Sequence, residues 1–457
     1  MNRARIWISL IALCILLAGR AAQADASKQT SPEPEGTTVR LLSLEEAVSI
    51  ALKNNPTVLI AEQQVRRAGG QVTEARSGLW PRLSASATHT RTGPISTVEI
   101  PTPTGTEEIE ISVPEATRYQ LTLSLPLDIS GQIRAATSAA SLNLLAQEFA
   151  LAAVRQSVAL EVQEAYLGVL RAESLKSVAD EALAAAREHL RVAKLNFEAG
   201  TVAYFDVLRA EVQVANFQQR LVEAENGVEL AKSSLNFTMG EDVNQPLEVE
   251  SPAEISPAAP PPVEESQQEA DARRPELLQA RAQVEAAEKG IRIAKAGLRP
   301  SLALVGNRNY DENPSAFGGL KRTWDATAAL SIPLFDSGET RGRLKQARAD
   351  EESARRTEEL TRNQVMLEVR QAHLSILEAT ERMRVAEKDV EQAREALRLA
   401  QLRYQSGLST SVEVTDAEVA LAQSMTNQVN AYYDYLLAQA RLQKAVGAPL
   451  QETAQED

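Results

Sequence analysis

The sequence is short of aromatic residues, cysteine and long apolar runs, and each shortage excludes a class of protein. Aromatic residues make up 4% of the 457 residues although 44% are hydrophobic. Such a composition is typical of long helices and coiled coils rather than of several compact cores. No apolar run reaches the roughly 18 residues that favour a membrane-spanning helix, which excludes a polytopic helical membrane protein. The net charge of -14 disfavours nucleic-acid binding, because it would repel phosphate.

The single cysteine, Cys14, lies in a segment with the features of a secretory signal peptide. Two arginines precede an apolar stretch at residues 6–18, and Ala22-Gln23-Ala24 provides a small-residue cleavage site. We therefore predict a signal peptide over 1–24 and a mature chain that begins at Asp25. That mature chain would contain no cysteine, so no disulfide would stabilise it.

Most of the remaining chain consists of two copies of one unit. Residues 56–83 match 275–302 at a constant offset of 219, and residues 161–240 match 368–447 without a gap at an offset of 207. The two offsets differ by 12 residues. The difference predicts an insertion in one loop of the first copy, roughly at 93–116.

The repeats divide the chain into segments with predicted bounds. They are the signal peptide, a flexible N-terminal arm at 25–41, repeat 1 at 42–240, a Pro-rich linker at 241–274, repeat 2 at 275–447 and a C-terminal tail at 448–457. Proline cannot donate a backbone hydrogen bond and disrupts helices, so we expect the linker to be extended rather than helical.

Each repeat has the same predicted elements: a helix of about 22 residues, two strands, a long helix and a return helix. In repeat 1 the strands are predicted at 82–92 and 117–128, the long helix at 131–199 and the return helix at 204–238. In repeat 2 the corresponding elements are predicted at 300–310, 322–334, 338–406 and 411–446. Apolar residues at alternating spacings of three and four predict antiparallel coiled-coil pairing of the long and return helices. At 1.5 Å per residue each long helix would span about 100 Å.

The strand pairs leave two interpretations open. Because a two-stranded hairpin is marginal alone, the strands must join a larger sheet. That sheet could be capped by another layer in a soluble protein, or several chains could close a barrel in an outer membrane. Four aromatic residues lie near strand ends, where they would suit membrane interfaces: Trp80, Tyr119, Tyr310 and Trp324. Ordinary sheet packing is the alternative explanation for them.

The order of these elements resembles the TolC-like outer-membrane efflux proteins, over about residues 42–447. Several motifs carry the resemblance, and the turns and strand ends among them occur once in each repeat, in the same order. The motifs are the opening Leu42-Ser43-Leu44-Glu45-Glu46-Ala47-Val48, the turns Gly78-Leu79-Trp80-Pro81 and Gly297-Leu298-Arg299-Pro300, the strand ends Leu125-Pro126-Leu127 and Ile332-Pro333-Leu334, and Tyr404-Gln405-Ser406-Gly407.

This resemblance implies a mainly α protein with β structure that acts as a homotrimer. Its antiparallel coiled-coil helices would form an α-barrel, and each chain would contribute four strands to a 12-stranded transmembrane β-barrel. The resemblance also implies a place in the outer membrane, in contact with its lipid, with a large periplasmic portion. A periplasmic adaptor (membrane fusion) protein and an inner-membrane transporter would be its partners.

The implied function is the exit duct of a tripartite efflux or type I secretion system, which conducts substrates passively to the exterior. The alternative is a secreted periplasmic coiled-coil scaffold or adaptor without channel activity. The alternating strand segments distinguish the two, because a scaffold does not need them at equal positions in both repeats.

The turns between long and return helices contain Gly200-Thr201 and Gly407-Leu408. Glycine accepts positive φ at helix ends, so the local interpretation is a C-cap and a tight turn. The resemblance adds a second role, because it places adaptor docking at these turns.

Acidic residues follow each turn, and the resemblance places Glu413 and Asp416 at the periplasmic entrance. Three copies of this pair around an axis would concentrate negative potential and attract cations. The alternative is that acids in a first helical turn stabilise the helix dipole, which is the favoured interpretation for Asp206. We also hypothesise that the Tyr404 hydroxyl donates a hydrogen bond to Asp206 and holds the entrance shut.

The sequence offers no pattern for catalysis. His89, His189 and His373 are far apart and lack metal-ligand spacing. No phosphate-binding glycine loop, nucleophile elbow or zinc motif is present in the sequence. An enzymatic function is therefore disfavoured, and no cofactor, metal or nucleic-acid partner is expected.

Overall fold

A computed structural model describes residues 40–94, 97–103, 105–110, 113–250, 260–314 and 320–448. The signal peptide predicted at 1–24 lies outside the described residues. The chain divides into residues 1–40 and 41–457, and the elements below belong to the second part except for Arg40, the first residue of a short strand. Within the described helices, none combines the length and the hydropathy of a membrane-spanning helix.

Each repeat contains helices of 22, 67 and 36 residues in that order. Repeat 1 has α3 (Pro56–Ser77), α4 (Gln132–Glu198) and α5 (Tyr204–Met239). Repeat 2 has α7 (Pro275–Ala296), α8 (Glu339–Gln405) and α9 (Ser411–Val446). A shorter helix precedes the first of each set, α2 (Leu44–Asn54) and α6 (Val263–Arg273).

Local residues explain where these helices begin. Proline occupies the first position of α3 and α7, where its missing N–H is not needed. At the start of α4, the Asp128 carboxylate accepts the backbone N–H groups of Ile133 and Arg134 at 3.0 and 2.9 Å. Asp336 accepts the Thr340 N–H at 2.8 Å at the start of α8. Both carboxylates satisfy donors that a helix N-terminus leaves unpaired.

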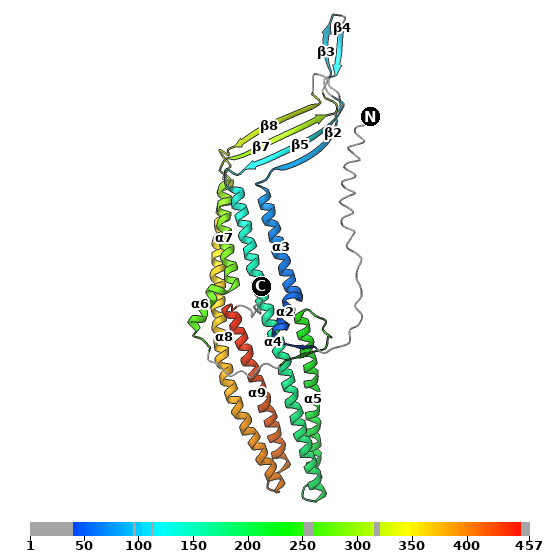
Figure 1. Ribbon diagram of the computed structural model, residues 1–457, viewed down its shortest axis with the longest axis vertical. Helices are drawn as coiled ribbons and strands as arrows, with labels where there is room; N and C mark the ends of the chain where they lie inside the picture. Colours follow the sequence, from blue (N-terminus) through cyan, green and yellow to red (C-terminus); the bar gives the residue numbers. More distant parts are fainter. Residues whose placement is uncertain are drawn as a thin grey trace. The chain divides into compact units, whose positions relative to one another are not determined.

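The long and return helices pair as hairpins, α4 with α5 and α8 with α9, and the two hairpins lie side by side through contacts of α4 with α9 (Figure 1). Small and large apolar residues alternate along the seams. One buried cluster of this kind joins Leu183, Ala186, Phe217, Leu221 and Ala422. This spacing of apolar residues fits the antiparallel coiled-coil pairing that the sequence predicts.

Four strands form one antiparallel sheet in the order β2-β5-β7-β8 (Figure 1). Their bounds are β2 (Arg82–Arg91), β5 (Glu115–Leu127), β7 (Ser301–Asp311) and β8 (Arg322–Ser331). Each repeat thus supplies two neighbouring strands, and β5 and β7 join the repeats. Among the described residues, no helix packs extensively against either face of this sheet.

The last strand is shorter than predicted, because β8 ends at Ser331 rather than at 334. Pro333, which cannot donate a ladder hydrogen bond, lies just beyond this end, whereas the aligned Pro126 lies within β5 and is paired with Ala303. Leu334 and Phe335 beyond it are 93% and 86% exposed. The insertion predicted as a loop at 93–116 contains a further hairpin, formed by β3 (Thr97–Thr102) and β4 (Gly105–Glu110).

The linker prediction at 241–274 is wrong in its last third, which forms the helix α6. The linker's prolines end at Pro262, which caps α6, and the residues after it are good helix formers. A short strand, β6 (Leu247–Val249), also lies in this segment and pairs with β1 (Arg40–Leu42). The strand β1 also enters the last residues of the predicted N-terminal arm at 25–41.

Candidate functional site

The two hairpin turns have the same backbone geometry. Gly200 and Gly407 adopt φ of 75° and 70°, in the left-handed region that glycine favours. The N–H of Thr201 donates to the Asn196 carbonyl at 2.9 Å, and the Leu408 N–H donates to the Arg403 carbonyl at 2.8 Å. These are Schellman motifs, which terminate a helix by satisfying its last carbonyls. Leu408 is 73% exposed, so the second turn presents an apolar side chain at its surface.

The hairpins meet near these turns through His189 of α4. Its Nε2 lies 3.0 Å from Oγ of Ser411, the first residue of α9. Its ring packs against Tyr404 of α8, with centroids 5.3 Å apart. All three side chains are buried, and burial lowers the pKa of His189 while the charge of Asp206 opposes that change. Sequence reasoning set His189 aside, because a contact between two hairpins has no local sequence signal.

The hypothesis of a hydrogen bond between Tyr404 and Asp206 is wrong for this structure. The Tyr404 hydroxyl is buried and makes no well-aligned hydrogen bond within 3.5 Å among the described residues, although the Asn196 side chain is close enough to lower its pKa slightly. Burial, and then the negative charge of Asp206, raise the pKa of Tyr404, so the two groups interact without bonding. The phenol instead packs against His189 and joins the apolar cluster of Leu397 and Val414.

Glu413 and Asp416 lie on the exposed side of the first turns of α9. Val414 and Thr415 between them are buried, so the two carboxylates share one solvent-facing stripe. A distant ion pair joins Glu413 Oε2 to Arg403 at 3.9 Å. Asp206 lies at the equivalent place in the first turn of α5. Acids in the first turn of a helix interact favourably with the helix dipole, and this holds whether or not these acids have a further role.

Glu418 is an acid that sequence reasoning missed. It is 3% exposed, and neither carboxylate oxygen has a hydrogen-bond partner among the described residues. Burial raises its pKa to about 7. The aligned acid of repeat 1, Glu211, pairs with Lys194 at 3.0 Å, but repeat 2 has Gln401 where repeat 1 has that lysine. The alignment of the repeats therefore contains a signal for this acid: repeat 2 keeps the glutamate but has glutamine in place of its lysine partner.

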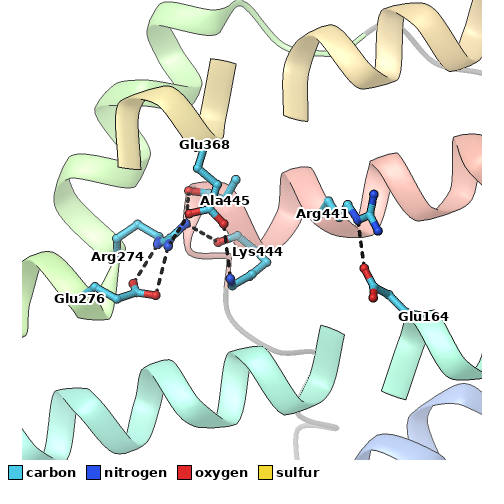
Figure 2. Close-up of polar contacts among 7 residues, drawn as sticks. All are labelled: Glu164, Arg274, Glu276, Glu368, Arg441, Lys444 and Ala445. Carbon is cyan, nitrogen blue, oxygen red and sulfur yellow. Dashed lines mark hydrogen bonds and ion pairs between the residues drawn. The ribbon is translucent and has the colours of Figure 1, made fainter. Parts of the chain in front are cut away.

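A buried arginine holds the base of the second hairpin (Figure 2). Arg274, 3% exposed, precedes α7 and donates to the Ala445 carbonyl of α9 at 3.2 Å. Its guanidinium also pairs with Glu276 at 2.9 Å and with Glu368 of α8 at 2.8 Å. Burial disfavours the Glu368 carboxylate, but Arg274 and Lys444 outweigh burial and lower its pKa.

A second ion pair in the same region joins the hairpins to each other. Arg441 of α9 pairs with Glu164 of α4 at 2.9 Å (Figure 2). This pair is partly exposed, so it adds little stability compared with the buried network around Arg274.

The sheet has one mainly apolar face, on which the register also places Arg308 and Arg322, and one polar face. The register places Tyr119 opposite Ala87 on one side and Tyr310 on the other, and Leu121 and Leu123 follow on the same face. The opposite face is tied by side-chain hydrogen bonds of Asn307 with Thr122 and Asp325, both at 2.9 Å, and by Arg118 with Asp311.

The predicted interface aromatics are exposed at the sheet. Trp80 and Trp324 are 69% and 80% exposed, and the rings of Tyr119 and Tyr310 lie 6.1 Å apart. Trp80 precedes β2 at the helical end of the sheet, whereas the tyrosines and Trp324 lie toward the other end. The residues that the structure describes include no group of three or more metal-ligating side chains.

Comparison with known proteins supports these features as those of a channel. The family model "Outer membrane efflux protein" matches residues 47–241 and 267–448. Outer membrane protein TolC of Vibrio cholerae is 27% identical over 416 residues, covering 89% of this chain and 90% of the relative. Outer membrane protein OprJ of Pseudomonas aeruginosa is 27% identical over 394 residues, covering 82% and 78%.

The fold is also that of a solved channel protein. A crystal structure of CusC superposes with a TM-score of 0.78 at 18% identity, covering 92% of this chain and 96% of that one. Since the family model covers well over half of the sequence, the chain belongs to the outer membrane efflux protein family and is an outer-membrane efflux channel with a large periplasmic helical part.

Proposed function

We propose that three copies of this chain assemble into the exit duct of a tripartite export system. Each copy would contribute its four strands to a 12-stranded barrel in contact with outer-membrane lipid, and its hairpins to a hollow periplasmic cylinder. A periplasmic adaptor and an inner-membrane transporter would deliver the substrate, which passes through without chemical change.

The observation that carries this proposal is the uncovered, two-faced sheet. Its apolar face runs along β5 from Tyr119 to Leu127, roughly 26 Å along the strand at about 3.3 Å per residue, which is about 20 Å of membrane height at the tilt of about 40° typical of barrel strands. A membrane barrel needs an apolar band about 25 Å tall with aromatic residues at both borders. The edge strands β2 and β8 have open ladders, which neighbouring copies would pair. A periplasmic scaffold has no use for such a sheet.

The hairpin turns supply the docking and entrance parts of the proposal. The adaptor would contact the turns at Gly200, Thr201, Gly407 and Leu408. Three copies of the stripe formed by Glu413 and Asp416 would narrow and negatively charge the entrance, and Asp206 would line the adjoining wall with the buried Tyr404 packed behind it. Closely spaced carboxylates repel one another and attract multivalent cations.

The test is conductance of the purified protein in a planar lipid bilayer. The proposal predicts stepwise conductance from a trimer, and block by a trivalent cation from the side of the hairpin turns. The double variant Glu413→Ala, Asp416→Ala should conduct but lose the block. The matched double variant Glu391→Ala, Glu395→Ala removes two acids of α8 and should keep it. A monomer without conductance would refute the duct.

A further inference from the structure

A strongly basic cavity of about 540 Å³ lies between the start of α4 and the end of α7. Five cations line it: Arg134, Lys289, Arg292, Lys295 and Arg299. Its described lining residues include no acid, although the whole chain has a net charge of -14. Like charges this close repel one another, so the arrangement favours a bound anion.

Two of the five cations are held by their own chain. Arg299 donates from Nη1 to the Ser130 carbonyl at 2.9 Å, which places it over the turn that starts α4. Arg134 lies 3.9 Å from Asp128, but that carboxylate already accepts two backbone N–H groups and its side chain is 1% exposed.

The other three cations are unneutralised. Among the described residues, no carboxylate oxygen lies within 4.0 Å of the charged groups of Lys289, Arg292 or Lys295. The acid next to them in sequence, Glu288, pairs across the other side of α7 with Arg355 of α8 at 3.3 Å. The side of α7 that meets α4 is therefore basic without compensation.

The fold itself does not require this cluster. In repeat 1 the positions aligned with Lys289, Arg292, Lys295 and Arg299 are Gly70, Thr73, Arg76 and Trp80. Repeat 1 therefore has one cation at these four aligned positions, and its other two helix arginines, Arg66 and Arg67, lie nearer the middle of α3. The cations of α7 therefore have a role that helix packing does not explain.

The cavity lies at the helical end of the sheet. Gly131 on its wall follows the end of β5 at Leu127, and Arg299 precedes the start of β7 at Ser301. Building on the membrane insertion of the sheet proposed above, we propose that this cavity binds the phosphate group of an anionic lipid headgroup at the periplasmic membrane surface. Guanidinium forks and lysine ammonium groups are suited to phosphate, and basic pockets beside membrane-embedded elements bind such headgroups.

The test titrates the delipidated full-length protein in detergent with short-chain phosphatidylglycerol, a matched phosphatidylcholine and inorganic phosphate, with native mass spectrometry as readout. Wild type should retain phosphatidylglycerol in preference to phosphatidylcholine. Each cation near an anionic headgroup contributes about fivefold to binding, so Lys289→Gln, Arg292→Gln, Lys295→Gln should bind roughly 100-fold more weakly. The control Arg66→Gln, Arg67→Gln, Arg76→Gln removes the same charge from α3 and should bind like wild type.

Equal retention of the two lipids by wild type overturns the proposal. Retention of inorganic phosphate without a preference for phosphatidylglycerol overturns the lipid as its source. The variant Lys289→Arg, Lys295→Arg keeps the charges and should bind like wild type. If it does, these positions tolerate substitution, and weaker binding by the Gln variant is due to lost charge rather than to misfolding. Conductance in phosphatidylcholine bilayers distinguishes failure of this proposal from failure of the proposed duct. A protein that conducts but shows no lipid preference rejects the lipid site and leaves the duct in place.

Discussion

The two helical hairpins share one backbone plan but are anchored by different chemistry. In repeat 1, Asn55 donates to the Thr238 carbonyl at 2.8 Å. In repeat 2, the aligned Arg274 donates to the carbonyl of Ala445, which aligns with Thr238, at 3.2 Å. The amide is neutral, whereas the buried guanidinium depends on the two carboxylates around it. The hydrogen bond to the aligned carbonyl group therefore involves only neutral groups in repeat 1, whereas in repeat 2 it depends on a network of charges.

Nearer the turns the contrast is reversed. Glu211 in the first hairpin forms an ion pair with Lys194 at 3.0 Å and is partly exposed. Glu418 in the second hairpin is buried, and among the described residues no cation pairs with it; Gln401 stands where repeat 1 has the lysine. The second hairpin therefore has a charged network at its base, and near its turn it has a carboxyl group that burial keeps from ionising easily. We infer that its packing depends on pH in a way that the first hairpin's does not.

The largest expected effect is at the anchors. Arg274→Ala should destabilise the folded protein by about 3–5 kcal/mol, because it leaves Glu276 and Glu368 without their buried partner. Asn55→Ala should cost about 1–2 kcal/mol, since it removes a helix cap and one hydrogen bond. Chemical unfolding followed by circular dichroism measures both. Equal losses would contradict the difference between the two anchors.

The next effect is the pH dependence that Glu418 confers. Its pKa is about 7 in the folded chain against an ordinary 4.5, so the folded protein binds an extra proton between these values. The contribution of Glu418 to the free energy of unfolding should therefore be greatest below about pH 4.5, fall as the pH rises through 7 and then level off. The shift corresponds to about 3 kcal/mol.

Glu418→Gln is the variant that isolates this effect. A neutral amide cannot ionise, so the fall between pH 5 and pH 8 should be smaller by about 3 kcal/mol than in wild type. Glu211→Gln in the first hairpin is the matched control and should leave the profile unchanged. A wild-type profile that Glu418→Gln does not alter would show that Glu418 ionises normally.

Gln401→Lys sharpens the comparison by giving the second hairpin the lysine of the first. A cation beside Glu418 favours the carboxylate, so the pKa of Glu418 should fall and the loss of stability above pH 7 should shrink by about 1–3 kcal/mol. Lys194→Gln, the reverse exchange, should cost below about 1 kcal/mol, because Glu211 is partly solvated. The same pH series of unfolding curves measures both.

The turn glycines should behave alike in the two repeats. A Cβ at Gly200 or Gly407 would meet no atom within 4 Å, so only the positive φ opposes substitution. Each change to alanine should cost about 1 kcal/mol. Gly240→Ala should cost more, because its Cβ would lie 2.7 Å from the Asn54 carbonyl oxygen. Unequal losses at Gly200 and Gly407 would indicate a contact that one turn makes and the other lacks.

The smallest expected effect is that of Tyr404→Phe. The hydroxyl makes no well-aligned hydrogen bond among the described residues, so its loss should change stability by less than about 0.5 kcal/mol and leave conductance unaltered. His189→Ala is the contrasting variant, because it removes the ring and the hydrogen bond that join the hairpins. A conductance change in Tyr404→Phe would restore a gating role for the hydroxyl.

Much of the fold could be predicted because its signals are local and occur twice. Prolines 56 and 275 begin helices, glycines 200 and 407 end them, and the alignment of the repeats supports each element. The helix α6 was not predicted, because the extended conformation inferred from the prolines up to Pro262 was also assigned to the residues after it. The hairpin of β3 and β4 was missed because an insertion without a second copy offers no such support.

By itself, the sequence determined the two copies, the helix ends and the alternation of the strands, since these depend on neighbours in the chain. Only the tertiary structure decided which acid is buried and which aromatic hydroxyl makes no well-aligned hydrogen bond. Glu418 is buried in a helix that contacts both α8 and α4, and His189 reaches Ser411 across 222 residues of sequence. Helical periodicity defines an apolar stripe, but the partner that covers it follows from how the two hairpins pack together.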